Sequence, residues 1–201
     1  MAGPRIAIVD SGGANIASLT YALDRLDVNS VLTRDADEIR NASHVILPGV
    51  GAAANAMQKL NSNNLVEVIK GLSQPVLGIC LGMQLFAQTS EEDTTECLGI
   101  VPAAAWKLHE SPQDPVPNMG WCQVMQSEPH ELFAGIENNS YFYFVHSFAL
   151  PVGEYTLAQS HHTGPFTAVL GQENFFATQF HPERSAVVGS KLLSNFAGLS
   201  A

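Results

Sequence analysis

The chain has 201 residues, of which 46% are hydrophobic and 14% charged, so it can bury a sizeable core and is not disordered. It carries 9 Lys and Arg against 19 Asp and Glu, and the net charge of -10 argues against nucleic acid or an anionic membrane surface as a partner. The 3 cysteines, Cys80, Cys97 and Cys122, fit neither a disulfide framework nor a zinc site. No apolar run suits a signal peptide or a membrane span, so we expect a cytoplasmic protein with one domain over residues 1–201.

The first half of the chain alternates short apolar runs with segments of helical periodicity. The runs predict buried strands at 5–10, 30–33, 44–47 and 75–79. Apolar residues at helical spacing predict helices at 15–26, 52–60, 65–72 and 81–88. This alternation is typical of a parallel sheet that is covered by helices on both faces.

The second half has a different rhythm, in which aromatic and β-branched runs follow one another with short spacers. These runs predict mostly antiparallel strands at 141–148, 155–159, 166–170 and 175–179, followed by a closing helix at 185–196. We therefore predict an α/β fold with a central mixed, mostly parallel sheet and helices on both faces.

The sequence Gly78-Ile79-Cys80-Leu81-Gly82 lies between a predicted strand and a predicted helix. A nucleophile between two glycines in this position is typical of a nucleophile elbow, whose tight turn strains the backbone. The following helix N-terminus favours a thiolate, and the amide of Leu81 can hold an oxyanion. Cys97 and Cys122 lack such a frame and are interpreted as structural.

A cysteine nucleophile needs a base, usually a histidine that a third group orients. His181 ends a predicted strand, and Glu183 follows two residues later, on the same side if the chain stays extended. His146 is the main competitor, because it also ends an aromatic strand. His161 and His162 favour a solvated loop over a metal site, because no matching ligand spacing accompanies them.

A glycine-containing loop, Pro48-Gly49-Val50-Gly51, follows the third predicted strand. Its unobstructed amides can hold a phosphate or a developing oxyanion. The loop lacks both a dinucleotide fingerprint and a Walker lysine, so a nucleotide site is the weaker interpretation.

Three blocks in this order, PGVG at 48–51, GICLGMQ at 78–84 and QFHPE at 179–183, resemble the class I (triad) glutamine amidotransferases, which have a flavodoxin-like fold. PNMGW at 117–121, FVHS at 144–147 and HPERS at 181–185 bring the chain closest to the glutaminase subunits of imidazole glycerol phosphate synthase in that family. The length fits a free-standing subunit.

The resemblance implies hydrolysis of L-glutamine to glutamate and ammonia, without a cofactor or metal. Cys80 attacks, His181 transfers the proton, and Glu183 orients the imidazole. The remaining implied residues are the oxyanion donors Val50, Gly51 and Leu81 and the substrate-binding residues Gly49, Gln84, Glu92, His146 and Ser147.

The resemblance also implies a partner, a (β/α)8 cyclase subunit in a heterodimer for histidine biosynthesis. That subunit receives ammonia through its barrel and makes imidazole glycerol phosphate and aminoimidazole carboxamide ribonucleotide. The implied interface consists of Asn15, Met119, Trp121, Tyr143 and Arg184. Trp121 is the leading anchor candidate, with a place in the core as its alternative.

Three other functions compete with this one. A glutaminase subunit of pyridoxal 5′-phosphate synthase has the same triad, but PGG and CAG are usual where this chain has PGVG and CLGMQ. A stand-alone cysteine hydrolase would not need the His-Pro-Glu sequence. A catalytically silent regulatory subunit would have no use for an intact Cys80, His181 and Glu183.

Overall fold

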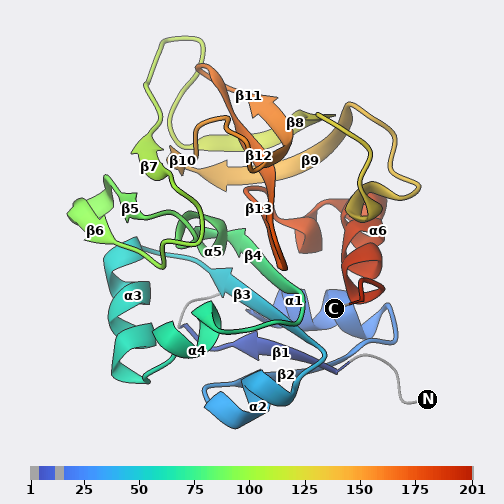
Figure 1. The fold of residues 1–201 in the computed structure, drawn as a ribbon. Helices are drawn as coiled ribbons and strands as arrows, with labels where there is room; N and C mark the ends of the chain where they lie inside the picture. Colours follow the sequence, from blue (N-terminus) through green and yellow to red (C-terminus); the bar gives the residue numbers. More distant parts are fainter. Residues whose placement is uncertain (1–4, 12–15, 201) are drawn as a thin grey trace.

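The computed structural model describes residues 5–11 and 16–200, and a nine-stranded mixed sheet runs through it (Figure 1). One half of the sheet is parallel and the other antiparallel. In spatial order the parallel strands are β2 (Asn29–Thr33), β1 (Arg5–Val9), β3 (His44–Gly49), β4 (Val76–Cys80) and β13 (Phe175–Thr178). The antiparallel strands are β12 (Pro165–Gln172), β11 (Thr156–His161), β8 (Asn118–Gln126) and β9 (Ser140–His146).

Helices cover both faces of the sheet, as the sequence predicts. The helices are α1 (Ile16–Asp24), α2 (Ala36–Asn41), α3 (Ala53–Ser62), α4 (Val66–Lys70), α5 (Leu81–Gln84) and α6 (Ala186–Ala197). Short 3-10 helices are η1 (Glu92–Thr94), η2 (Glu131–Phe133) and η3 (Pro182–Arg184). A smaller sheet beside α5 has the order β10 (Phe148–Ala149), β7 (Ala104–Lys107), β5 (Thr89–Ser90) and β6 (Thr95–Glu96).

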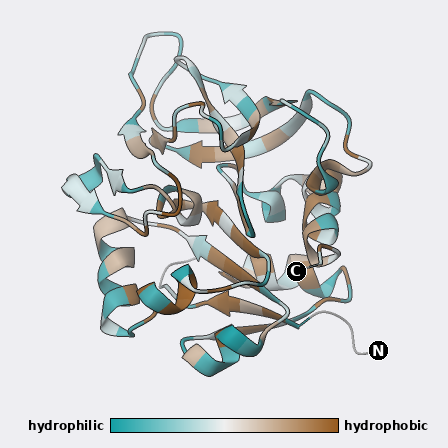
Figure 2. Cartoon of the chain, in the orientation of Figure 1, coloured by the Kyte–Doolittle hydropathy of each residue, from teal (hydrophilic) through white to brown (hydrophobic). Residues whose placement is uncertain are grey.

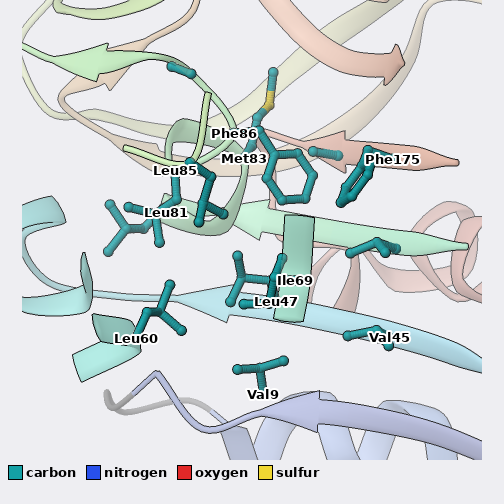
Figure 3. Packing of buried hydrophobic residues seen from close by; sticks show 14 of the residues in the cluster. Val9, Val45, Leu47, Leu60, Ile69, Leu81, Met83, Leu85, Phe86 and Phe175 are labelled. Atoms are coloured by element: carbon teal, nitrogen blue, oxygen red, sulfur yellow. The ribbon is translucent and has the colours of Figure 1, made fainter. Parts of the chain in front are cut away.

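Alternation along the parallel strands divides the core into two layers. In β1, Ala7 and Val9 pack with α3, α4 and α5, whereas Ile6 and Ile8 pack with α1 and α6 on the other face. Hydrophobic residues accordingly concentrate on the central strands, and hydrophilic ones on the outer sides of the helices (Figure 2). The packing of the first layer is close, with the rings of Phe86 and Phe175 edge to face at 5.5 Å (Figure 3).

The structure confirms most of the predicted elements, but it shortens one helix and adds elements that were not predicted, among them strands β5, β6 and β7 of the smaller sheet. Helix α5 ends at Gln84, not at residue 88, because the carbonyls of Leu85, Phe86 and Ala87 accept hydrogen bonds from residues 98–101. Helix α2 was not predicted, although Asp35 caps it through the amides of Asp37 and Glu38. Strand β8 was not predicted either, and it pairs with β9 along residues 118–124. Within the described part of the chain, no helix is long and apolar enough to cross a membrane.

Candidate active site

Cys80 occupies a strained turn where β4 meets α5. Its backbone angles are φ 54° and ψ -107°, a region that a side chain rarely adopts and that is found at functional sites. A Cβ on Gly82 would lie 1.9 Å from the Leu47 carbonyl oxygen, and one on Gly78 would lie 2.9 Å from the Gly82 backbone. Because no other residue fits there, the two flanking glycines are a steric requirement of this elbow. The structure thus places Cys80 as the sequence predicts.

The neighbouring strand β3 brings the glycine loop to the same place. Gly49 pairs with Cys80 across the parallel register, and a Cβ on it would lie 2.7 Å from Cβ of Leu81. Gly49 is therefore a packing position beneath the elbow. Val50 and Gly51 come next and line a cavity together with Cys80 and Leu81. Gly51 has a φ of +93°, which favours glycine.

His181 and Glu183 form a close pair beside the thiol. His181 follows the end of β13, and its Nδ1 lies 2.8 Å from Glu183 Oε1. The expected extended geometry is wrong, because Pro182–Arg184 turn into η3, and the turn itself brings the carboxylate to the ring. Both side chains are buried, with exposed fractions of 8% and 3%.

The charges around His181 favour its protonated form. Burial acts to lower the pKa of His181, but hydrogen bonds and charge interactions with Cys80 and Glu183 outweigh it and raise this pKa to about 10. A protonated imidazole beside a cysteine stabilises the thiolate. Burial and nearby Glu92 raise the pKa of Cys97 to about 11, and burial raises the pKa of Cys122, so both stay as thiols at neutral pH.

A cavity of about 580 Å³ gathers most of the predicted site residues. That volume suits a small-molecule site. Its lining residues include Val50, Gly51, Cys80, Leu81, Gln84, Glu92, His146, Ser147, His181 and Arg184. Glu183 lies behind His181, and Gly49 beneath the elbow, so neither is part of this lining.

Gln84 and Glu92 both line the cavity. Gln84 is buried, contrary to the usual position of a helix glutamine on the surface, and its Nε2 donates to the Phe148 carbonyl at 2.9 Å. Glu92 accepts at Oε2 from the backbone amide of Ala53 at 2.7 Å, so it caps α3, whose own N-cap residue makes no side-chain bond. This capping role was not predicted.

His146 is not placed to act as the base. Its Nδ1 lies 2.9 Å from the Phe148 carbonyl oxygen, and its Nε2 lies 3.0 Å from Nδ2 of Asn118. The carbonyl accepts and the amide donates, so the ring is neutral with its proton on Nδ1. Burial lowers the pKa of His146 to about 4, in spite of the bond to Phe148.

In the described part of the chain, the other histidines belong to no cluster of metal ligands. Within residues 5–11 and 16–200, no group of three or more His, Cys, Asp or Glu side chains could hold an ion. His162 instead lies 2.9 Å from the Pro115 carbonyl through Nε2.

An apolar surface lies next to the cavity. Met119 and Trp121 on β8 are 65% and 51% exposed, so a core position for Trp121 is wrong. The Trp121 ring meets Tyr143 on β9 at 6.0 Å, and the Arg184 guanidinium lies 4.6 Å from the Tyr143 ring centre. Arg184 also lines the cavity, so this surface is continuous with its rim. Asn15 lies outside the described residues.

Two buried amides were missed by the sequence reasoning. Asn118 is 3% exposed and bonds His146, and Gln179 is fully buried with its Nε2 3.8 Å from Cys80 Sγ. Both residues belong to quoted motifs, PNMGW and QFHPE, but no pattern in one sequence shows which motif residues turn inward.

The comparisons agree with this geometry. Residues 7–198 match the family described as Glutamine amidotransferase class-I, so the chain belongs to the class I glutamine amidotransferases. A crystal structure from Thermoplasma acidophilum, described as a candidate GMP synthase subunit, has the same fold, with a TM-score of 0.77 at 22% identity over 98% of this chain and 94% of that one.

Relatives with higher identity narrow the assignment. The chain is 49% identical to "Imidazole glycerol phosphate synthase subunit HisH 2" of Legionella pneumophila (strain Paris), over 98% of each chain. It is 44% identical to "Imidazole glycerol phosphate synthase subunit HisH" of Vibrio cholerae, over 95% of this chain and 97% of that one. Within its class, the chain is a member of the HisH group.

Proposed function

We propose that the cavity hydrolyses L-glutamine to glutamate and ammonia, and that residues 1–201 act as one glutaminase unit that passes the ammonia to a cyclase subunit. The observation that carries the hydrolysis is the buried row of Cys80, His181 and Glu183, with the sulfur on a strained elbow. The match of a single family over residues 7–198 supports one unit.

The chemistry follows from these positions. The Cys80 thiolate attacks the side-chain carboxamide carbon, and the oxygen takes up the negative charge beside the elbow and the glycine loop. Amides there, from Leu81 and the Val50–Gly51 segment, stabilise this oxyanion. The His181 imidazolium gives its proton to the departing nitrogen, which leaves as ammonia. Neutral His181 then takes a proton from water, which attacks the thioester and releases glutamate.

The cavity offers complementary groups for the amino-acid end of glutamine. The Glu92 carboxylate attracts an α-ammonium. Both Nε2 protons of Gln84 are engaged, by Phe148 and Gln179, so its carbonyl oxygen is the atom left to accept from that ammonium. His146 and Ser147 form the neighbouring wall, where the α-carboxylate fits.

The apolar surface of Met119, Trp121 and Tyr143 fits a partner protein. Exposed apolar patches with aromatic anchors mark protein interfaces, and this one adjoins the cavity rim at Arg184. A (β/α)8 cyclase that docks here can receive ammonia before water protonates it. The names of the relatives, as subunits of imidazole glycerol phosphate synthase, support this partner and a cytoplasmic role in histidine biosynthesis.

Glutamate release from glutamine tests the proposal. The purified chain is assayed alone, then with the cyclase and the ribonucleotide ligand of the cyclase, with Cys80→Ala as the control. Strong stimulation that the control abolishes is expected. Equal activity with and without the cyclase would leave a glutaminase without this pathway, and no activity in any mixture would favour a silent regulatory subunit.

The docking surface has its own test. Trp121→Ala is expected to weaken cyclase binding by about 2 kcal/mol, since aromatic anchors dominate interfaces. Leu32→Ala is the matched control, because Leu32 is also exposed but lies on β2, at the opposite edge of the sheet. Titration calorimetry measures both variants, and equal affinities would show that the partner docks elsewhere.

A further inference from the structure

A row of buried hydrogen bonds lies behind the nucleophile, and one of its members, Gln179, has no part in the chemistry above. Gln179 is fully buried, and its Nε2 lies 3.8 Å from Cys80 Sγ. Its Oε1 lies 3.3 Å from Gln84 Nε2, which in turn lies 2.9 Å from the Phe148 carbonyl oxygen. A continuous chain of hydrogen bonds therefore joins this carbonyl to the reacting sulfur.

The carbonyl of Phe148 fixes the direction of this chain. A carbonyl oxygen only accepts, so the side chain of Gln84 must turn its NH2 group toward Phe148. The second proton of that NH2 group then points to Gln179, whose side-chain oxygen must accept the hydrogen bond. This leaves the NH2 group of Gln179 facing Cys80, so the group beside the sulfur is a donor.

The backbone holds Gln179 in this position. Its own N–H donates to the Ala168 carbonyl at 2.9 Å, which ties the residue to β12 just after β13 ends. With both the main chain and the side-chain oxygen engaged, the amide has little freedom to turn away. The donor is therefore set before substrate arrives, as a preorganised electrostatic contact requires.

We propose that Gln179 is a further catalytic residue, whose side-chain N–H donates to the Cys80 thiolate and stabilises it as nucleophile and as the group expelled from the thioester. The proposal rests on the proposed function of Cys80. The second neighbour of the sulfur, the Val145 carbonyl oxygen at 3.6 Å, can only accept and so favours the protonated thiol. Gln179 favours the thiolate instead, because an N–H donates a stronger hydrogen bond to a charged acceptor than to a neutral one.

The test is the pH dependence of Cys80 alkylation by iodoacetamide in Gln179→Met. Methionine keeps the unbranched shape but donates no hydrogen bond. The midpoint of the alkylation rate is expected to move up by about one pH unit, and the acid limb of kcat/KM by the same amount. Cys80→Ala shows how much alkylation occurs at the other cysteines.

Gln126→Met is the matched control. Gln126 also donates through Nε2 to a carbonyl, that of Ile136 at 3.1 Å, but lies on β8 away from the sulfur. This variant should lose a similar hydrogen bond and keep the alkylation midpoint. A midpoint in Gln179→Met equal to that of the unsubstituted protein would overturn the proposal.

If Gln179→Met does not fold, a measurement on the unsubstituted protein tests the same proposal. The side-chain amide protons of Gln179, assigned by NMR, should shift as Cys80 ionises and should not do so in Cys80→Ala. Amide proton signals of Gln179 that do not shift when Cys80 ionises would also overturn the proposal. Neither the alkylation midpoint nor the NMR shift needs turnover, so both test the role of Gln179 alone. The glutaminase proposal fails separately, if Cys80→Ala still releases glutamate from glutamine.

Discussion

His181 and His146 lie at the ends of strands on the same cavity, yet their surroundings leave His181 protonated and His146 neutral. Both are buried, with 6% and 5% of the whole residue exposed. The pKa of His181 is raised to about 10, whereas the pKa of His146 is lowered to about 4. His181 lies between a thiol and a carboxylate, while His146 lies between the neutral amide of Asn118 and the carbonyl of Phe148.

The difference shows that burial does not by itself decide the charge of a histidine. Desolvation acts on both rings in the same direction, against the charged form. Only His181 has partners that carry or acquire negative charge, and these overcome desolvation. A proton-transfer residue and a neutral positioning residue can therefore be told apart by their neighbours and not by their depth.

Replacing each histidine by asparagine should give the largest contrast. His181→Asn removes the proton donor and acceptor, and kcat for glutamate release should fall on the order of 10⁶-fold, as for the base of other triads. His146→Asn keeps an amide donor toward Phe148 and should lower kcat by less than about tenfold, because it moves no proton. The reverse ranking in steady-state assays would mean that the base is His146.

Glu183→Gln should bring the pKa of His181 closer to that of His146. Glutamine can still accept from Nδ1 but carries no charge, so the pKa of His181 should fall from about 10 and kcat should drop roughly 10⁴-fold. NMR titration of the imidazole protons measures the pKa directly. Glu137→Gln, at an exposed position, is the control and should change neither quantity; an unchanged pKa in Glu183→Gln would contradict the role of the carboxylate.

The parallel half of the sheet, with the elbow, was predictable because local sequence and fold agree there. Apolar strand, glycine frame and helix stand in one continuous segment, and the steric limits at Gly78 and Gly82 leave a direct trace in the sequence. His181 and Glu183 were predictable as a pair for the same reason, although their 3-10 turn was not.

Strand β8 was missed because its pattern is inverted. Its exposed residues include Met119, Trp121 and Met125, while Asn118 is buried. Such a strand does not show the usual apolar-inward alternation, and an outward apolar row has its reason in the proposed partner surface. The amide contacts of Asn118 and Gln179 could not be predicted, because they depend on which strands become neighbours.

The smallest expected effect is the dependence of stability on pH that His146 brings. Between about pH 6.5 and 4, His146 is protonated in the unfolded chain but neutral in the folded protein, because folding lowers its pKa to about 4. The free energy of unfolding should therefore fall by about 1.4 kcal/mol per pH unit as pH decreases through this window, about 3 kcal/mol in all.

In His146→Asn this contribution is absent, and the variant should lose less stability in acid than the unsubstituted protein. His44, whose pKa burial also lowers, and the carboxylates are common to both proteins and cancel in the difference. Urea unfolding at several pH values measures it, and parallel curves for the two proteins would mean that folded His146 accepts the proton after all.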